Sequence, residues 1–352
     1  MKDYILHIGL PKTGTTAIQT QYFGRLPQSS ICYNPPSIVG SLIQALKLLD
    51  FNILKEADLQ LLNDVIRWQE NRIRQQKILI SLENLSQRLG RFNFVDRGNF
   101  LKALFPDAAI VLTVRYQPAL LRSLYLQFLK QNYFLTPEEV FVPFANREFS
   151  EAEQWKASMQ IDIMEWDYKE TVKYFREIYG EKFHVFFYET FSSSLVGIGQ
   201  AVLNLAGCHI DDGISHSLPK TNVSYDSFTA NLILAIVRKN LAFRANRGFD
   251  SRYMQDLMDQ ATQARFQFDA ANVTEFASRM HQSKYVLRIT HTGLDRQLIR
   301  IIRAIGRTLE RCQSRSYELP EPIKTYLESQ AKTMNASLHE IIDRRTIPKQ
   351  YM

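Results

Sequence analysis

The sequence predicts a three-layer αβα fold with a mainly parallel sheet, followed by a helical C-terminal extension. Two observations carry this prediction. Over residues 1–215, short apolar runs rich in β-branched and aromatic residues alternate with stretches of helical periodicity. Beyond about residue 215 the helical periodicity continues without comparable strand patterns. We therefore expect an α/β core over 1–215 and a helical extension over 216–352 that packs on the core and partly shapes a substrate site.

Each expected strand is short and apolar, as is typical of strands buried on both faces of a sheet. The five are Tyr4–Gly9, Ile31–Tyr33, Lys77–Leu82, Ala109–Arg115 and Phe183–Tyr188. Helices are expected over Thr16–Phe23, Ser41–Gln75 (in one or two pieces), Pro118–Gln131 and Asp167–Tyr179. Segment 132–150, rich in Pro and Phe, is expected to be an irregular loop of the kind that covers a site. Further helical patterns occur near 226–243, 251–266 and 294–312.

The composition indicates a folded, soluble protein of the cytoplasm. The 352 residues are 45% hydrophobic and 12% aromatic, which is enough for a sizeable core. Three scattered cysteines form neither a disulfide framework nor a zinc-ligand spacing, as is typical of a reducing compartment. No apolar run reaches the length of a membrane span, and the N-terminus lacks the pattern of a signal peptide. No metal is expected, because no His, Cys and acidic residues have ligand spacing.

The segment His7–Gln19 predicts an anion-binding loop. A strand ends at Gly9, a tight turn contains Pro11 and Gly14, and a helix begins near Thr15. The unpaired N–H groups and the dipole at a helix N-terminus attract anions, and glycines let the backbone approach them closely. The alternative is a helix-capping turn with an incidental surface lysine. The coincidence of strand, glycines, lysine and threonines favours the anion site.

The loop departs from the Walker A pattern of nucleotide-binding proteins. Its two glycines and Thr16 have the Walker A spacing, but Thr15 stands where that motif has its lysine. The lysine of this loop, Lys12, lies three residues earlier. The displacement suggests an anion other than a nucleoside triphosphate, with the ammonium beside the bond that is broken.

A second phosphate contact is expected at Arg115 and Ser123. Arg115 ends the expected strand Ala109–Arg115, and Ser123 lies in the first turns of the next helix. Together a guanidinium fork and a hydroxyl can hold one phosphate group. For either residue alone, an arginine that satisfies strand-end carbonyls or a serine on a helix face is the favoured interpretation. Together with the anion-binding loop, that interpretation becomes the weaker one.

Glu83 is the candidate general base. It follows the strand Lys77–Leu82, and the carboxyl ends of parallel strands meet at the edge where ligands bind. We therefore expect Glu83 beside the anion loop. Two alternatives stay open: a cap for a helix starting near Leu85, or the Walker B carboxylate of a kinase or NTPase. The missing Walker A lysine weighs against the second.

These motifs resemble those of a known family. The run Pro11–Thr16, PKTGTT, after a first strand resembles the 5′-phosphosulfate loop of sulfotransferases that use 3′-phosphoadenosine 5′-phosphosulfate (PAPS). The longer pattern I-G-x-P-K-T-G-T-T-x-x-Q is most similar to the bacterial carbohydrate-type members, whose fold resembles that of P-loop nucleoside-triphosphate hydrolases. Arg115 and Ser123 have the spacing of the family's 3′-phosphate pair. Lys77–Asn84 resembles its I-S-S-E-N segment, with Leu82 replacing the second serine.

The resemblance implies a sulfotransferase that moves the sulfuryl group of PAPS to an acceptor hydroxyl, on a carbohydrate or glycoconjugate. It implies in-line transfer without a metal, with Glu83 as base and Lys12 stabilising the leaving phosphate. Tyr188 would lie near the adenine and Lys220 in a loop over the 3′-phosphate, although the R-K-G triplet of the animal cytosolic enzymes is absent. A core tyrosine explains Tyr188 equally well. The implied donor-binding residues are Pro11, Lys12, Thr13, Gly14, Thr15, Thr16, Arg115, Ser123, Tyr188 and Lys220.

The positive charge concentrates toward the C-terminus. Of the net +7, residues 281–352 contribute 13 Lys and Arg against 7 Asp and Glu. Five arginines would share one face of a helix, at Arg296, Arg300, Arg303, Arg307 and Arg311. A solvated helix face is the favoured interpretation, and peripheral contact with a membrane or an acidic glycan is the alternative. No nucleic-acid partner is expected, because no aromatic residues are interleaved with these arginines.

Two functions from other classes stay open. One is a small-molecule kinase that uses ATP, and the other is a non-catalytic protein that binds glycans or membranes. Binding to 3′-phosphoadenosine 5′-phosphate (PAP) rather than to ATP with Mg²⁺ would separate the sulfotransferase from the kinase.

Overall fold

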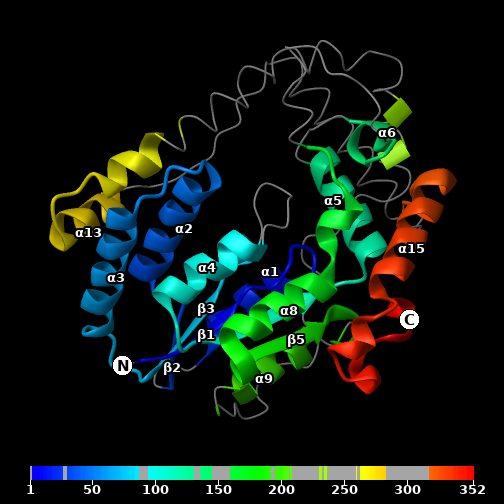
Figure 1. Cartoon of the computed structure of the whole chain (residues 1–352). Helices are drawn as coiled ribbons and strands as arrows, with labels where there is room; N and C mark the ends of the chain where they lie inside the picture. Colours follow the sequence, from blue (N-terminus) through cyan, green and yellow to red (C-terminus); the bar gives the residue numbers. More distant parts are fainter. Residues whose placement is uncertain are drawn as a thin grey trace.

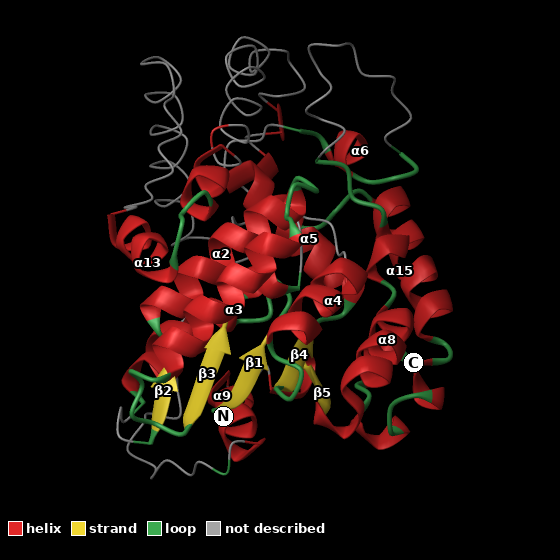
Figure 2. Ribbon diagram, turned by 60° about the vertical axis from the view of Figure 1, so that its left-hand side comes forward, coloured by secondary structure: helices red, strands yellow, loops and turns green. Residues whose placement is uncertain are grey.

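The five expected strands form one sheet in the order β2-β3-β1-β4-β5, and all four pairings are parallel. Figure 2 shows the strands side by side in this order. The computed structural model has β1 (Asp3–His7), β2 (Ile31–Tyr33), β3 (Lys77–Ser81), β4 (Ala109–Val114) and β5 (Phe183–Phe187), with ends at most two residues from those expected. Because β1 is central, the loop that follows it lies at the middle of the sheet's carboxyl edge.

The structure describes residues 2–26, 30–86, 94–130, 135–144, 159–191, 195–205, 207, 230–231, 234–235, 259, 262–282 and 317–352. Within these ranges no helix is both long and apolar enough to cross a membrane. The predicted boundary near residue 215, Lys220 and the arginine helix of 294–312 lie outside them. These three stay predictions.

Strand side chains alternate between two cores, so helices cover both faces of the sheet. In β1, Ile5 belongs to the smaller core and Leu6 to the larger one. The smaller core lies against the turns that follow β1 and against α9 (Leu195–Leu205). The larger core lies under the helices that connect the other strands. This two-sided burial explains the continuous apolar strands and confirms the three-layer αβα class.

The helices follow the expected pattern with two differences in detail. The expected helix Thr16–Phe23 is a single turn, α1 (Thr15–Ala17), continued by a π turn (Ile18–Tyr22) and a 3₁₀ turn (Phe23–Arg25). The long expected helix Ser41–Gln75 starts earlier and is two helices, α2 (Pro36–Asp50) and α3 (Glu56–Glu70). Asn52, at φ 55°, lies in the break between them. The other two are α5 (Gln117–Lys130) and α8 (Tyr168–Tyr179).

Several helices were not expected from periodicity. They are α4 (Phe94–Leu104), α9, α6 (Pro137–Val140) within the expected irregular loop, α13 (Val273–Gln282) and α15 (Glu321–Asn335). In α4 the buried positions include Arg97 and Gly98, which break the apolar stripe that marks a helix. Short helical turns complete the described chain: Glu83–Leu85, Ile163–Trp166, Gly180–Lys182, Tyr188–Phe191, Leu338–Glu340, Arg344–Thr346 and Lys349–Tyr351.

The C-terminal helices pack on opposite ends of the core. Figure 1 shows α13 beside α2 and α3, and α15 beside α5. On the first side, Arg265 donates to Asp58 of α3 at 2.9 Å. On the second side, Gln117 of α5 and Asn335 of α15 are buried and exchange two amide hydrogen bonds, each 2.9 Å long. Buried amides that satisfy each other fix the register of two helices, because a shift would leave both unpaired.

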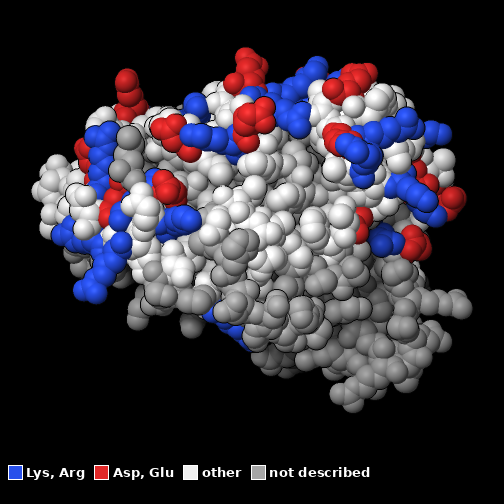
Figure 3. All heavy atoms as spheres, turned by 90° about the horizontal axis from the view of Figure 1, so that it is seen from below, with Lys and Arg blue, Asp and Glu red and all other residues white. Residues whose placement is uncertain are grey.

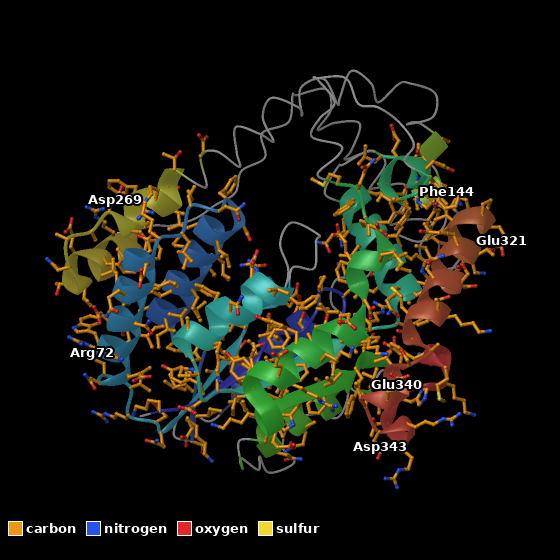
Figure 4. The ribbon with its side chains drawn as sticks, viewed as in Figure 1. Arg72, Phe144, Asp269, Glu321, Glu340 and Asp343 are labelled. Carbon is orange, nitrogen blue, oxygen red and sulfur yellow. The ribbon has the colours of Figure 1, made fainter. Side chains whose placement is uncertain are left out.

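The region around α15 also contacts α8 and the segment after α6. Lys169 of α8 donates to Glu340 at 2.8 Å and to Ser337 at 2.7 Å. The rings of Phe144 and Tyr326 meet edge to face at 5.6 Å. Figure 4 labels Phe144 near one end of α15 and Glu340 near the other. On the face shown in Figure 3, basic side chains are interspersed with acidic ones, as expected of a solvated surface.

Candidate active site

The loop between β1 and α1 takes a backbone shape that only a few residue types adopt easily. Lys12 has φ 64° and Gly14 has φ 76°, so two left-handed residues flank Thr13. Left-handed backbone at a lysine is uncommon and costs on the order of 1 kcal/mol. Alternation of this kind turns successive N–H groups toward one point and forms an anion-binding concavity. The left-handed residues Lys12 and Gly14 therefore shape the turn between β1 and α1.

The backbone amides of this loop are available to a ligand. Among the described residues, the N–H groups of Lys12 through Thr16 have no hydrogen-bond acceptor. The next two amides, of Ala17 and Ile18, both donate to the carbonyl of Gly14 and close the first helical turn. Backbone donors are normally paired, so a run of five open ones at a helix N-terminus fits a phosphate-like anion.

Gly9 brings the loop close to the sheet. A Cβ at this position would lie 2.7 Å from Cγ2 of Thr15 and 2.9 Å from Nε2 of His7. Any larger residue would therefore push the loop away from β1. The hydroxyl of Thr13, which is fully buried, donates to the carbonyl of Leu10 at 2.5 Å and holds the turn from inside.

Lys12 is a partly buried cation close to other charges. Burial lowers the pKa of its ammonium group below the ordinary lysine value; Glu83 opposes this change, and Lys130 and Arg115 add to it. Burying a cation beside further cations is unfavourable unless an anion compensates it. The electrostatics of the loop thus favour a strongly anionic ligand next to Lys12.

The structure brings Glu83 to the loop, as expected from its place after β3. Glu83 begins a 3₁₀ turn, and its carboxylate accepts a hydrogen bond from the hydroxyl of Thr15. Thr15 is 1% exposed, so this contact ties the carboxylate to the start of α1. Ser86 in turn donates to the carbonyls of Glu83 at 3.0 Å and Gly9 at 3.4 Å. A partly exposed carboxylate held at the rim of an anion loop can accept a proton from a bound hydroxyl group.

Arg115 also lies against the loop. Its guanidinium donates to the carbonyl of Lys12 at 2.7 Å and lies over the ring of Tyr188, 4.9 Å from the ring centroid. A planar guanidinium stacks well on an aromatic face and keeps further N–H donors free to bind oxyanions. Lys12, Arg115 and Tyr188 therefore come together, although they lie in three distant segments.

The other predicted site residues differ in their burial and in whether the structure describes them. Pro11, Thr13 and Thr15 are buried in the loop, whereas Thr16 is exposed at the start of α1. Ser123 is 8% exposed on α5, and the described contacts do not join it to Arg115. Lys220 lies outside the described residues.

A buried polar network supports the loop from below. Nδ1 of His7 lies 2.8 Å from the Ser81 hydroxyl, and its Nε2 lies 3.0 Å from the Thr113 hydroxyl. Gln19 of the π turn donates to the Ser81 hydroxyl at 3.1 Å. The side-chain oxygen of Asn34 accepts from the backbone N–H of Ser81 at 2.8 Å. His7 thus joins β1 to both neighbouring strands at their carboxyl ends. With no exposed surface, His7 is part of the buried interior of the sheet.

His7 makes the stability of the fold depend on pH. Burial lowers the pKa of its imidazole from 6.5 to about 4, so the unfolded chain binds the extra proton between these values. The free energy of unfolding should therefore fall by about 3 kcal/mol as the pH is lowered from about 6.5 to 4 because of this residue. Urea unfolding at several pH values measures the slope. His7→Gln should flatten it, whereas the exposed His339→Gln control should leave it unchanged; equal slopes in all three proteins would contradict the prediction.

Three residues behind Arg115 were not expected from the sequence as parts of the site. Tyr168 donates to the carbonyl of Arg115 at 2.6 Å, and Glu189 accepts from the N–H of Tyr116 at 2.8 Å. Tyr351 donates to the same Glu189 carboxylate at 3.0 Å. The tyrosine–glutamate pair 188–189 was a visible signal for Glu189 in the sequence. Nothing in the local pattern around Tyr168 or Tyr351 indicates this role.

Fold and site together define a P-loop-like αβα protein whose anion loop lacks the Walker A lysine. No family model matches the chain, and no curated protein matches it. In structure the chain is similar to a sulfotransferase from Alicyclobacillus acidocaldarius, over 69% of this chain and 96% of that one, with 14% identity and a TM-score of 0.39.

Proposed function

We propose that this protein is a sulfotransferase that moves the sulfuryl group of PAPS to the hydroxyl group of an acceptor. The proposal rests on one observation: three functional groups meet at the loop between β1 and α1. Open backbone amides and Lys12 form an anion site, Glu83 is bonded to its Thr15, and Arg115 is bonded to the carbonyl of Lys12. This network offers an anion site, a base and a second cation. Such a set could bind a nucleotide that carries phosphate groups at two positions and transfer a group from it.

The donor set of the loop fits the 5′-phosphosulfate end of PAPS. The amides of Lys12 through Thr16 would bind its oxygens, with Pro11 and Gly14 shaping the turn and Lys12 supplying positive charge. A bound anion would offset the effect of burial on the Lys12 ammonium. Thr16 is exposed at the helix start, where its hydroxyl can add a donor.

The neighbouring groups fit the nucleoside end. Arg115 would bind the 3′-phosphate, with Ser123 as the second donor if the ligand draws the two together. The guanidinium of Arg115 already lies over the ring of Tyr188, and Tyr188 would lie near the adenine. Lys220, by its place in the sequence, would belong to a loop over the 3′-phosphate.

PAPS, when bound, supplies an activated sulfuryl group attached to a phosphate leaving group. Glu83 would accept the acceptor's hydroxyl proton on its carboxylate while the new O–S bond forms and the S–O bond to the 5′-phosphate breaks. Lys12 and the loop amides would stabilise the negative charge that develops on the departing phosphate oxygen. Preorganised donors act most strongly in such a partly buried site. Thr15 would orient the carboxylate through the hydrogen bond seen in the structure.

A carbohydrate or glycoconjugate is the acceptor we propose. The support is the resemblance of the loop sequence to the carbohydrate-type enzymes. Aromatic side chains in segments 34–75, 132–160 and 216–290 would suit stacking on sugar rings. The arginine helix of 294–312 would favour an acidic acceptor or a membrane surface.

Ligand binding and label transfer test the proposal together. The full chain should bind PAP and should transfer label from [³⁵S]PAPS to acceptors in a glycan screen. Binding of ATP only with Mg²⁺, and none of PAP, would instead support the kinase. Glycan or vesicle binding that survives Lys12→Ala, but fails when Arg296–Arg311 are neutralised, would support the non-catalytic alternative. Either result without PAP binding would overturn the sulfotransferase.

A further inference from the structure

The peptide group between Arg115 and Tyr116 is held at both ends by side chains. Its carbonyl accepts from the Tyr168 hydroxyl at 2.6 Å, and its N–H donates to the Glu189 carboxylate at 2.8 Å. This peptide lies one residue beyond the end of β4 at Val114, where the sheet no longer constrains the chain. Its orientation sets the direction in which the Arg115 side chain leaves the backbone. Fixing the peptide therefore fixes the guanidinium.

Tyr351 connects the two groups that hold this peptide. Its hydroxyl donates to the second oxygen of Glu189 at 3.0 Å, and its ring contacts that of Tyr168 at 6.5 Å between centroids. The same ring meets Tyr116 at 5.6 Å and Phe187 at 4.9 Å, both edge to face.

Tyr351 is well placed to act as a constant donor. Only 1% of it is exposed, although it lies in a short 3₁₀ turn (Lys349–Tyr351) far along the chain from β4. Burial raises the pKa of its hydroxyl well above the ordinary tyrosine value, with Tyr168 and Glu189 adding to the effect. The hydroxyl therefore stays protonated and can only donate to a carboxylate neighbour.

We propose that Tyr351 is a positioning residue for Arg115, acts on it through Glu189, and makes the site selective for nucleotides with a 3′-phosphate. This inference rests on the proposed function, in which Arg115 binds that phosphate. Loss of the hydroxyl removes one hydrogen bond to Glu189 and weakens its hold on the 115–116 peptide. The guanidinium then leaves its place between the carbonyl of Lys12 and the ring of Tyr188. The anion loop, which makes no contact with Tyr351 among the described residues, keeps its shape.

A pair of nucleotides separates positioning from a general structural role. PAP carries the 3′-phosphate and AMP lacks it, so their affinities for the full chain are measured by calorimetry. In Tyr351→Phe, PAP binding should weaken about tenfold, as expected when a hydrogen bond to a charged group is lost. AMP binding should change less than about twofold. Glu189→Gln should show the same selective loss and serves as the test if Tyr351→Phe does not fold.

The matched control is Tyr125→Phe. Tyr125 is also fully buried and donates to a backbone carbonyl, that of Leu135 at 3.0 Å, away from Arg115. This variant should leave the ratio of the PAP and AMP affinities unchanged. Parallel losses for PAP and AMP in Tyr351→Phe, or no loss for either, would overturn the inference.

Reaction of Arg115 with phenylglyoxal gives a readout that needs no nucleotide. In the ligand-free protein, peptide mass spectrometry should show faster modification of Arg115 in Tyr351→Phe than in the wild type. Wild-type protein that fails to bind PAP would overturn the proposed function, while accelerated modification would still support the positioning role. PAP binding by the wild type with identical modification rates and affinities in the variant would overturn the positioning role alone.

Discussion

Lys12→Ala should lower the rate of sulfuryl transfer by about 10²–10³-fold, the usual effect of removing one preorganised group that stabilises a developing anion. Lys12 is partly buried at the anion loop, and burial lowers the pKa of its ammonium group. A bound phosphate restores favourable electrostatics there, so the lysine contributes most when charge builds on the leaving oxygen. The positive φ at this position costs alanine about as much as it costs lysine, because both are L-residues with a Cβ. The loop should therefore keep its shape in the variant.

The rate is measured as initial velocity of label transfer at saturating PAPS, together with the affinity for PAP. Lys102→Ala is the control, because Lys102 is a half-buried lysine of α4 that is not part of the proposed site. It donates to the carbonyl of Pro106 at 2.9 Å. The control should retain wild-type rates. Retention of more than about half of the wild-type rate by Lys12→Ala would remove Lys12 from the mechanism.

Glu83→Gln should lower the turnover rate by about 10²–10⁴-fold, as expected for loss of a general base. The amide oxygen of the new side chain can still accept the hydrogen bond from Thr15, so the rim of the loop should stay in place. PAP affinity should accordingly stay close to that of the wild type. Glu83→Gln should thus lower turnover without changing the binding of the sulfuryl donor. Lys12→Ala, in contrast, should change both.

A matched control separates the role of the Glu83 carboxylate from a general effect of substitution. Glu177→Gln, at an exposed position of α8, should keep the wild-type rate. A turnover rate of Glu83→Gln close to that of the wild type would show that another group accepts the proton. A large loss of PAP affinity would show instead that Glu83 serves the loop's structure.

The strands and the anion loop could be predicted from local sequence because their signals are local. Five apolar runs define five strands, and the glycines and Lys12 define the turn after β1. The helix α15 could also have been found, since its buried residues Ile323, Leu327, Ala331 and Met334 recur at helical spacing. The helix α4 is different, because the ion pair between Arg97 and Asp50 places a charge where a helix pattern expects an apolar residue.

The partners of the site residues depend on the packing of distant segments. Thr15 has a place in the loop pattern, but only the fold turns its hydroxyl to Glu83, 68 positions away. The spacing of Arg115 and Ser123 suggested a pair, whereas Arg115 bonds to the carbonyl of Lys12 and no described contact reaches Ser123. Spacing along a chain indicates that two side chains can meet, and it does not determine which partner each one takes.

By itself the sequence determined the αβα class, the first strand with the glycine-containing turn after it, and the chain's departure from Walker A at Thr15. These features depend on local periodicity and on backbone conformations that few residues adopt. Only the tertiary structure decided what surrounds that loop. It placed His7 between Ser81 and Thr113, and it brought Tyr351 to Glu189 behind Arg115. Such contacts join groups more than 70 positions apart, and their strength comes from burial, which a sequence pattern does not record.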